Sequence, residues 1–249
     1  MEIHHAHHHD HPQHKEKLWK HYALEFFMLF LAVFCGFLAE NFRESRIENE
    51  REKVYMENLY QDLKDDTANF SNYNKITSDF LLSIDTMMLL MKSPGRDAHL
   101  GKIYFNARMA TVRPNYFFPN ERTFDEMKSS GSLRLISHQQ VADSISGYYN
   151  SLNRVLFQNE VIREKLGEYQ VVAGNIFDAQ ILFQILKDGE LPSSDSLKLL
   201  SYDPMVINGV LARLQYFYGS RLLQQRWCAE RAQKAQRLLQ LIQKEYHFQ

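Results

Sequence analysis

The sequence has 249 residues, of which 45% are hydrophobic and 24% charged, and its formal net charge is -1. This near-neutral charge argues against a general nucleic-acid-binding protein, which normally carries a basic excess. Glycine and proline are scarce, with 10 and 6 residues, while Leu, Gln, Glu and Lys are abundant, so the composition predicts an all-α fold.

The chain begins with a histidine-rich stretch. Histidines occupy positions 4, 5, 7, 8, 9, 11 and 14, and apolar residues are rare among them. We expect residues 1–21 to form a disordered tail. Neutral imidazoles at this density bind transition-metal ions, so metal gathering by the tail is one hypothesis. The alternatives are a solvated polar tail or an added tag.

Residues 22–39, YALEFFMLFLAVFCGFLA, form the longest apolar stretch. As a helix they would span about 27 Å, close to the hydrocarbon thickness of a bilayer, which predicts a single transmembrane helix. A buried helix of a soluble protein would show a polar face, and residues 26–39 have none. A cleaved signal peptide would end in a small-residue cleavage site, but here the chain continues into Glu40 and Asn41.

The basic residues on the two sides of this span are almost balanced. Lys15, Lys17 and Lys20 precede it, and Trp19 and Tyr22 lie where an interfacial aromatic belt would be. The basic residues that follow are Arg43, Arg46, Arg51 and Lys53. We predict a bacterial inner-membrane protein with its N-terminus in the cytoplasm and its main domain in the periplasm, because long domains translocate despite such charges.

Two features within the span suggest interactions. Glu25 is its one ionisable acidic group, and it is either an interfacial glutamate or a functional residue. Ala32 and Gly36 are one helical repeat apart, as are Cys35 and Ala39, so a second helix could approach closely. The predicted partners are therefore the lipid bilayer and either a second copy of this chain or another membrane protein.

Residues 40–249 are predicted to form one helical bundle domain. A first helix should extend from Glu40 to about Lys92, where Ser93, Pro94 and Gly95 end it. A seven-residue repeat gives this helix a bundle or coiled-coil seam. The seam consists of Met56, Leu63, Phe70, Thr77, Ile84 and Met91, with Leu59, Tyr73, Phe80 and Met87 beside them.

Residues 96–122 are the least regular part. A short helix is expected over residues 100–110, followed by the turn-rich sequence RPNYFFPNE. Tyr116, Phe117 and Phe118 lie between two prolines, where regular helix is excluded. They either cap the bundle core or form an exposed patch that binds a partner.

Four further helices are predicted. Thr123 and Glu126 match a capping box for a short helix that ends near Gly131. Ser137 and Gln140 match another for a long helix over residues 138–177, and a short helix follows over residues 179–187. The long helix has an inward stripe of Val141, Ile145, Tyr148, Leu152, Val155, Ile162, Leu166, Tyr169, Ala173 and Ile176.

Asp203 and Pro204 supply an N-cap and a first-turn proline for a last helix that extends to about Tyr246. Its inward stripe comprises Ile207, Val210, Leu211, Leu214, Tyr218, Leu222, Ala232, Ala235, Leu239 and Ile242. The expected architecture is thus an antiparallel bundle of three long helices plus short helices, preceded by the transmembrane helix.

Charge supports an antiparallel pairing of the first and last long helices. The last helix carries Arg221, Arg226, Arg231, Lys234, Arg237 and Lys244, and the first carries Glu44, Glu48, Glu50, Glu52, Glu57, Asp62, Asp65 and Asp66. We expect these opposite charges to lie side by side and favour this register. The basic end could also attract anionic lipid if the domain were cytoplasmic.

No catalytic constellation is recognisable. His99, His138 and His247 are scattered, and the sequence lacks an H-x-x-x-H motif, a paired-cysteine motif and a phosphate-binding glycine loop. Asp65 and Asp66 point in different directions on a helix and fit a solvated face. We therefore predict no catalytic, cofactor-binding or metal-binding residue and no enzymatic activity.

Two stretches carry a family resemblance. They are EFFMLFLAVFCGFLAENFRE (residues 25–44) and TFDEMKSSGSLRLI (residues 123–136). Together with the histidine-rich start, they resemble an uncharacterised family of small single-pass membrane proteins found in Bacteroidota. The resemblance implies a membrane location and a helical architecture, and it transfers no catalytic residue.

Three functions remain open from the sequence. The first is a membrane-anchored helical scaffold or interaction module without catalytic activity. The second is a ligand-sensing bundle that signals through a separate partner, because helical bundles hold small molecules between their helices. The third is metal gathering through the histidine-rich tail.

Overall fold

The computed structural model describes residues 13–112 and 115–248. These residues form helices and connections without a strand, which confirms the predicted all-α class. The helices are α1 (Gln13–Lys92), η1 (Arg96–His99), α2 (Leu100–Val112), α3 (Arg122–Ser129), η2 (Ser132–Leu135), α4 (Gln139–Ala173), α5 (Ala179–Asp188) and α6 (Pro204–Tyr246). Six of the seven histidines for which metal binding was one hypothesis lie in residues 1–12, outside the described residues. Residues 13–21 belong to α1, so a disordered tail extending to residue 21 is wrong.

The chain divides into two compact units, residues 1–53 and 54–249, and α1 contributes to both. In the first unit, α1 contains an 18-residue window that is apolar and long enough to cross a membrane, with none of that window buried. Large apolar side chains are exposed on all sides there, including Phe27, Phe30 and Val33. This exposure separates the segment from the core helix of a soluble protein, which would be mostly buried.

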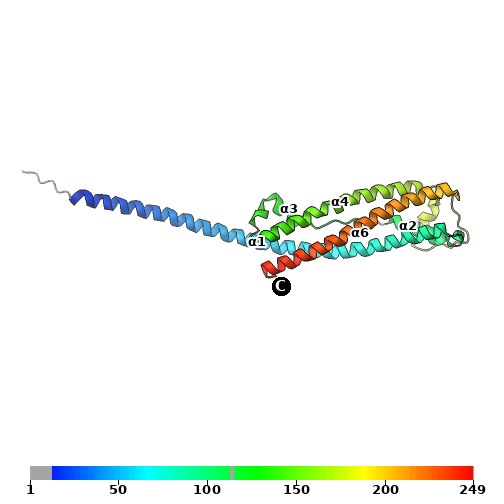
Figure 1. The fold of residues 1–249 in the computed structure, drawn as a ribbon, viewed down its shortest axis with the longest axis horizontal. Coiled ribbons are helices and arrows are strands. Elements are labelled where there is room, and N and C mark those ends of the chain that lie inside the picture. The colour runs from blue at the N-terminus through cyan, green and yellow to red at the C-terminus, as the bar shows by residue number, and fades with distance from the viewer. Residues whose placement is uncertain (1–12, 113–114, 249) are drawn as a thin grey trace, which may run out of the picture. The chain divides into compact units, whose positions relative to one another are not determined.

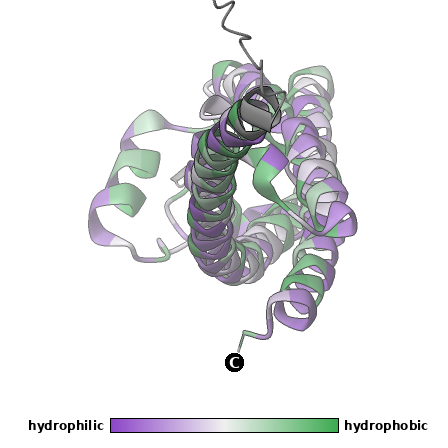
Figure 2. Ribbon diagram, turned by 90° about the vertical axis from the view of Figure 1, so that its left-hand side faces the viewer, coloured by the Kyte–Doolittle hydropathy of each residue, from purple (hydrophilic) through white to green (hydrophobic). Residues whose placement is uncertain are grey.

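The second unit is the helical bundle. The part of α1 from Val54 onward lies beside α4 and α6, and α4 runs in the same direction as α1 (Figure 1). α6 runs antiparallel to α1, because Gln225 donates to the Asn74 carbonyl (3.1 Å) while the earlier Tyr218 donates to the later Asp85 (3.2 Å). Figure 2, which looks along the long helices, shows hydrophobic and hydrophilic residues on each of them, as amphipathic helices require.

The predicted inward stripes are confirmed for α1 and α4. All ten seam residues of α1 and all ten stripe positions expected for α4 are buried. The stripe of α6 is confirmed through Leu214 and again at Ala235 and Ile242, but the other positions predicted after Leu214 are not fully buried. Tyr218, Leu222, Ala232 and Leu239 are only half-buried, and the buried positions are Phe217, Ser220, Arg221, Gln224, Cys228, Arg231, Ala235, Leu238 and Ile242. The prediction followed apolar residues alone, whereas several polar ones are buried here.

Helix starts follow local sequence only in part. The predicted N-cap of α6 is confirmed, since the Asp203 side chain accepts from Met205 N–H (2.7 Å). The short helices α2 and α5 also lie where expected. The Thr123 capping box is wrong, because Thr123 lies inside α3 and is buried. Its backbone N–H instead donates to Asp62 Oδ2 of α1 (3.2 Å), so a distant side chain replaces the local cap.

The bounds of α4 also differ from expectation. The helix begins at Gln139 with His138 in the N-cap position, where Ser137 was predicted to cap it, and it ends at Ala173 instead of residue 177. Ile176 and Phe177 are nevertheless buried in the turn that follows. The apolar pattern therefore predicted the burial of Ile176 correctly, but it did not predict that the helix ends before this residue.

Candidate functional site

A layer of buried polar residues divides the core of the bundle. The apolar cluster at one end uses α1 residues from Ile84 onward, and the cluster at the other uses α1 residues up to Tyr73. The same division occurs on α4 and α6. The polar layer between the clusters consists of Thr77, Gln158, Asn159, Ser220, Arg221 and Gln224, all buried.

Hydrogen bonds within the polar layer join all three long helices. Gln224 of α6 donates from Nε2 to Asn159 Oδ1 (2.6 Å) and to the Val155 carbonyl (3.1 Å), and it accepts at Oε1 from Tyr73 of α1. Gln158 donates to the Ser220 carbonyl (2.9 Å). Because unmet buried polar groups are costly, this layer favours one register of the three helices over any shifted one.

Arg221 is a buried cation in this layer, with 1% of its surface exposed. Its Nη1 donates to the Asn115 carbonyl (2.6 Å), and its guanidinium lies over the rings of Phe80 (4.9 Å) and Phe217 (5.4 Å). Nε and Nη2 find no hydrogen-bond partner among the described residues. Burial lowers the pKa of Arg221. Ring faces and a carbonyl dipole thus stabilise the charge in place of a carboxylate.

Residues 115–121 form an extended crossing segment held against the long helices. Phe117 is 2% exposed and stacks on Phe70 of α1, with ring centroids 4.1 Å apart. Asn159 of α4 donates to the Phe117 carbonyl (3.0 Å). The segment is therefore part of the core, and its backbone polar groups are bonded by side chains from the helices.

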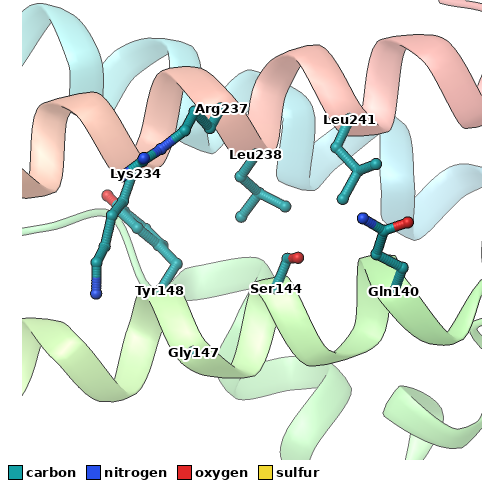
Figure 3. Close-up of a pocket in the computed structure, with 8 residues that line it drawn as sticks. All are labelled: Gln140, Ser144, Gly147, Tyr148, Lys234, Arg237, Leu238 and Leu241. Atoms are coloured by element: carbon teal, nitrogen blue, oxygen red, sulfur yellow. The ribbon is translucent and has the colours of Figure 1, made fainter.

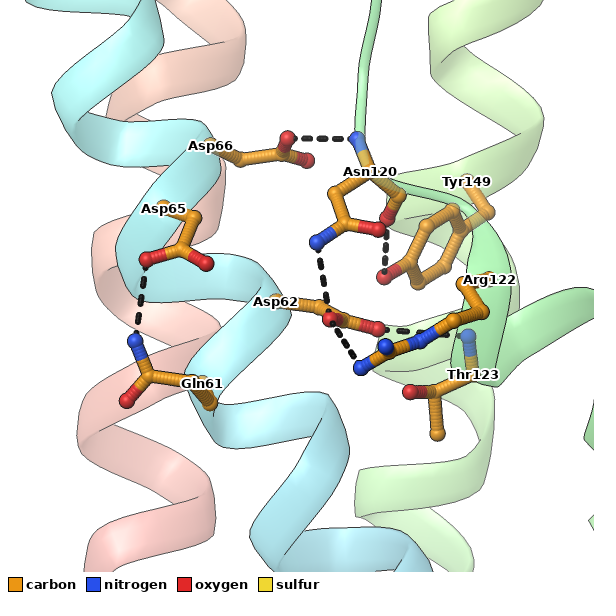
Figure 4. A network of polar contacts seen from close by, with 8 residues as sticks. All are labelled: Gln61, Asp62, Asp65, Asp66, Asn120, Arg122, Thr123 and Tyr149. Carbon is orange, nitrogen blue, oxygen red and sulfur yellow. Dashed lines mark hydrogen bonds and ion pairs between the residues drawn. The ribbon is translucent and has the colours of Figure 1, made fainter.

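Two aspartates of α1 bind the end of the crossing segment (Figure 4). Asn120 donates from its backbone N–H to Asp66 Oδ1 (2.7 Å) and from Nδ2 to Asp62 Oδ1 (2.8 Å). Arg122 lies 3.5 Å from Asp62, and Tyr149 donates to the Asn120 carbonyl (3.4 Å). Asp62 and Asp66 are one helical repeat apart, so both carboxylates face the segment.

Burial shifts the titration of this cluster. The pKa of Asp66 is raised to about 6, because desolvation and the neighbouring charges of Asp62 and Glu121 outweigh its bonds from Asn120 and Tyr148. Burial and the Asp66 charge raise the pKa of Tyr148, so its hydroxyl remains a donor to Asp66 Oδ2 (2.7 Å). The hydrogen bonds of the cluster hold the crossing segment against α1.

A groove of about 450 Å³ lies between α4 and α6. Lys234, Arg237, Leu238 and Leu241 line it from α6, and Gln140, Ser144, Gly147 and Tyr148 line it from α4. Figure 3 shows the Leu238 and Leu241 side chains directed toward the α4 side of this α4–α6 groove. No local sequence pattern predicts this groove, because its two walls are almost a hundred residues apart along the chain.

The three aromatic residues predicted to act together have different environments. Phe117 is core, Phe118 is 64% exposed, and Tyr116 is half-buried with the Arg163 guanidinium 5.4 Å from its ring. The core-capping interpretation is thus confirmed for Phe117 and wrong for Phe118. Alternation along an extended backbone explains the difference, since successive side chains point to opposite sides.

The expected pairing of acidic α1 with basic α6 is partly wrong. Asp62 and Asp66 are buried and bind the crossing segment, and Arg221 binds a carbonyl of that segment. Arg231 is buried as well and donates to the Ser151 carbonyl of α4 (3.3 Å). Asp65 is exposed and accepts from Gln61. The predicted solvated face is therefore confirmed for Asp65 and wrong for Asp66.

The residues singled out in the apolar segment are exposed in the first unit. Glu25, Ala32, Cys35, Gly36 and Ala39 all have exposed surfaces, and a Cβ added at Gly36 would meet no atom within 4 Å. The small-residue face is therefore open to a second helix. His99 lies in η1, His138 precedes α4 and His247 follows α6, and the described ranges contain no group of three or more His, Cys, Asp or Glu side chains that could hold a metal ion.

Sequence reasoning missed Asn120, Asn159, Arg221 and Gln224 as structural anchors. A signal was present for Gln224, because a polar side chain occurs where the apolar spacing of α6 calls for a core residue. No local signal identifies Asn120 or its partner Asp62, since the pair forms across 58 residues.

Comparison with known proteins identifies a family of unknown function. A family model described as a family of unknown function (DUF6090) matches residues 25–203. No curated protein and no solved structure matches the chain. The match covers more than half of the chain, from the apolar part of α1 to the residue that precedes α6, and includes the crossing segment and α4. The chain therefore belongs to the DUF6090 family.

Proposed function

We propose that the protein is a single-pass membrane protein whose helical bundle acts as a scaffold or interaction module without catalytic activity. The observation that carries the proposal is the apolar segment of α1, whose large side chains are exposed on every side. Exposing such an apolar surface to water is unfavourable, whereas the acyl chains of a bilayer would cover it. The bundle supports the binding role because its buried polar groups hold structural elements together.

The same proposal includes location and partners. The bundle lies in the periplasm of a bacterium, with residues 22–39 in the inner membrane, and the resemblance to Bacteroidota proteins supports this envelope location. The partner is a second copy of the chain or another membrane protein that packs against the small-residue face. An alkaline phosphatase fusion at the C-terminus tests orientation, because the enzyme should be active only if the bundle is periplasmic.

Charge insertion tests the membrane assignment. Leu29 and Val33 are 65% and 69% exposed. Changing both to arginine adds about 2.5–3.5 kcal/mol each to the free energy of insertion at the centre of a span. We expect L29R/V33R to leave the membrane pellet after alkaline carbonate washing, while the native chain remains in it.

The matched control places the same two charges on exposed apolar positions of the bundle. Leu82 and Leu89 are 66% and 74% exposed, so L82R/L89R should stay in the pellet. Release of this control together with L29R/V33R would indicate general misfolding, and the experiment would then not support the membrane assignment. Retention of L29R/V33R would contradict a span at these residues.

The α4–α6 groove favours ligand sensing as a second candidate function. Its volume is within the range of small-molecule sites between the helices of bundles. A ligand that binds the folded state should raise its melting temperature. A sensing role further requires that binding change the association with a partner protein, measured by native mass spectrometry with and without ligand.

A further inference from the structure

The α4–α6 groove carries two cations that no other group neutralises. Lys234 and Arg237 project from one side of α6, and neither forms a hydrogen bond or ion pair with any described residue. The neighbouring acids are engaged elsewhere: Glu230 pairs with Arg231, and Glu245 with His138 and Lys244. No carboxylate lines the groove. Its walls therefore favour an anion.

The opposite wall adds neutral polar groups and space. Gln140 and Ser144 of α4 face the groove with an amide and a hydroxyl, and Gly147 leaves room because it has no side chain (Figure 3). Tyr148 forms part of the wall, but its hydroxyl is already bonded to Asp66. The available donors thus come from Lys234, Arg237, Gln140 and Ser144.

This donor set fits a phosphate better than a carboxylate. An ammonium, a guanidinium, an amide and a hydroxyl offer more N–H and O–H groups than the two oxygens of a carboxylate can accept, whereas a phosphate ester has at least three acceptor oxygens. Leu238 and Leu241 supply an apolar strip beside the cations. A ligand with a phosphate and an adjoining apolar group would contact both parts of the groove.

We propose that the α4–α6 groove binds the phosphate of an amphipathic phosphoester, with Lys234 and Arg237 on the anion and Leu238 and Leu241 against the apolar part. The source is either a membrane phospholipid or a soluble phosphoester. This binding site goes beyond the proposed scaffold role and does not depend on it, because the groove belongs entirely to the bundle.

The test uses the full-length protein in a neutral detergent and octyl phosphate as the probe. Binding is followed by the melting temperature and by isothermal titration, with octanoate and inorganic phosphate measured alongside. Octyl phosphate should bind at least about tenfold more tightly than either, because octanoate has only two acceptor oxygens for the donors of the groove and inorganic phosphate lacks the apolar part. Equal affinity for octanoate and octyl phosphate would overturn the phosphate assignment.

Two variants examine the groove itself. K234Q/R237Q removes both cations and should weaken octyl phosphate binding about a hundredfold, at about tenfold for each charge-assisted contact. The control K187Q/R226Q removes two exposed charges outside the groove. It should change the affinity less than about twofold. Equal losses in the two double variants would mean nonspecific charge attraction and overturn the proposal.

G147L fills the groove while retaining both cations. A Cβ at this position meets no atom within 4 Å, so the variant should fold with a melting temperature at or above that of the native protein. Binding should fall at least tenfold, roughly as for loss of a charged contact. Unchanged binding by folded G147L would show that the anion lies elsewhere on the surface and overturn the site.

Native mass spectrometry of protein extracted from its own membrane distinguishes the two sources. Retained phospholipid that is lost in G147L identifies a lipid headgroup as the ligand. Octyl phosphate binding without retained phospholipid identifies a soluble phosphoester. The absence of both bound phospholipid and octyl phosphate binding would overturn the proposal while leaving the carbonate test of membrane anchoring unaffected.

Discussion

At the residue scale, the carboxyl of Asp66 links stability to pH. Asp66 has an ordinary pKa of 3.8 that burial raises to about 6. Above pH 7 it is ionised in both the folded and unfolded states. As the pH falls from about 7 to 4, the folded state binds the proton first, so the free energy of unfolding should rise by up to about 3 kcal/mol. The gain is complete below the unfolded pKa.

D66N should abolish this part of the pH dependence, because the amide cannot titrate. Its Oδ1 can still accept from Asn120 N–H, and Tyr148 can accept from the new amide. Urea unfolding of the two proteins at pH 7 and pH 5 measures the difference. The control is D65N, at an exposed position, which should retain the native pH dependence. An identical pH profile for D66N and the native protein would contradict the assignment.

Sequence patterns do not distinguish the environments of Asp65 and Asp66. Asp65 and Asp66 are adjacent and alike in sequence, yet one is exposed and the other is buried against the crossing segment. Helical periodicity shows that they face different directions, but not which direction has a partner. The partner of Asp66, Asn120, lies 54 residues away, and no local rule connects them.

At the element scale, the crossing segment should depend on Phe117 and not on Phe118. Phe117 is buried against Phe70, and Phe118 is 64% exposed. F117A removes a buried ring and should lower the free energy of unfolding by about 3–5 kcal/mol. F118A is the matched control and should change it by less than about 0.5 kcal/mol.

Chemical denaturation followed by circular dichroism measures both variants. A loss in F118A as large as that in F117A would contradict the alternation of the segment. Similar stability of F117A and the native protein would show that the segment does not contribute to the core.

The buried face of a helix was predictable where apolar residues repeat along it. It was not predictable where buried polar residues bond to residues far away in the sequence. The seams of α1 and α4 followed from apolar spacing, because a helix that buries one stripe must repeat it every three or four residues. The part of α6 after Leu214 did not, since Arg221, Gln224 and Arg231 occupy buried positions there. These side chains are tolerated because carbonyl and amide oxygens of other elements accept hydrogen bonds from them, and the Tyr73 hydroxyl donates one to Gln224.

At the scale of the whole molecule, the polar layer explains why three long helices adopt one register. Apolar contacts alone permit sliding, since neighbouring turns of a leucine-rich helix are nearly equivalent. The bonds of Gln224 to α1 and α4 exist in one alignment only. A bundle fixed in this way presents constant surfaces, including the α4–α6 groove, which suits a module that acts by binding.

Assembly through the apolar part of α1 should depend on its small residues. Ala32 and Gly36 present a face on which a second helix can approach, and a leucine at Gly36 would hold the backbones apart. We expect the native protein to form a defined oligomer in mild detergent and G36L to shift it toward monomer, as measured by native mass spectrometry. A23L places a leucine side chain roughly on the opposite side of the helix, at about 100° per residue, and should leave the oligomer intact. If G36L and the native protein had equal subunit numbers, the contact would have to lie on another face, and exposed Phe118 would become the first position to test.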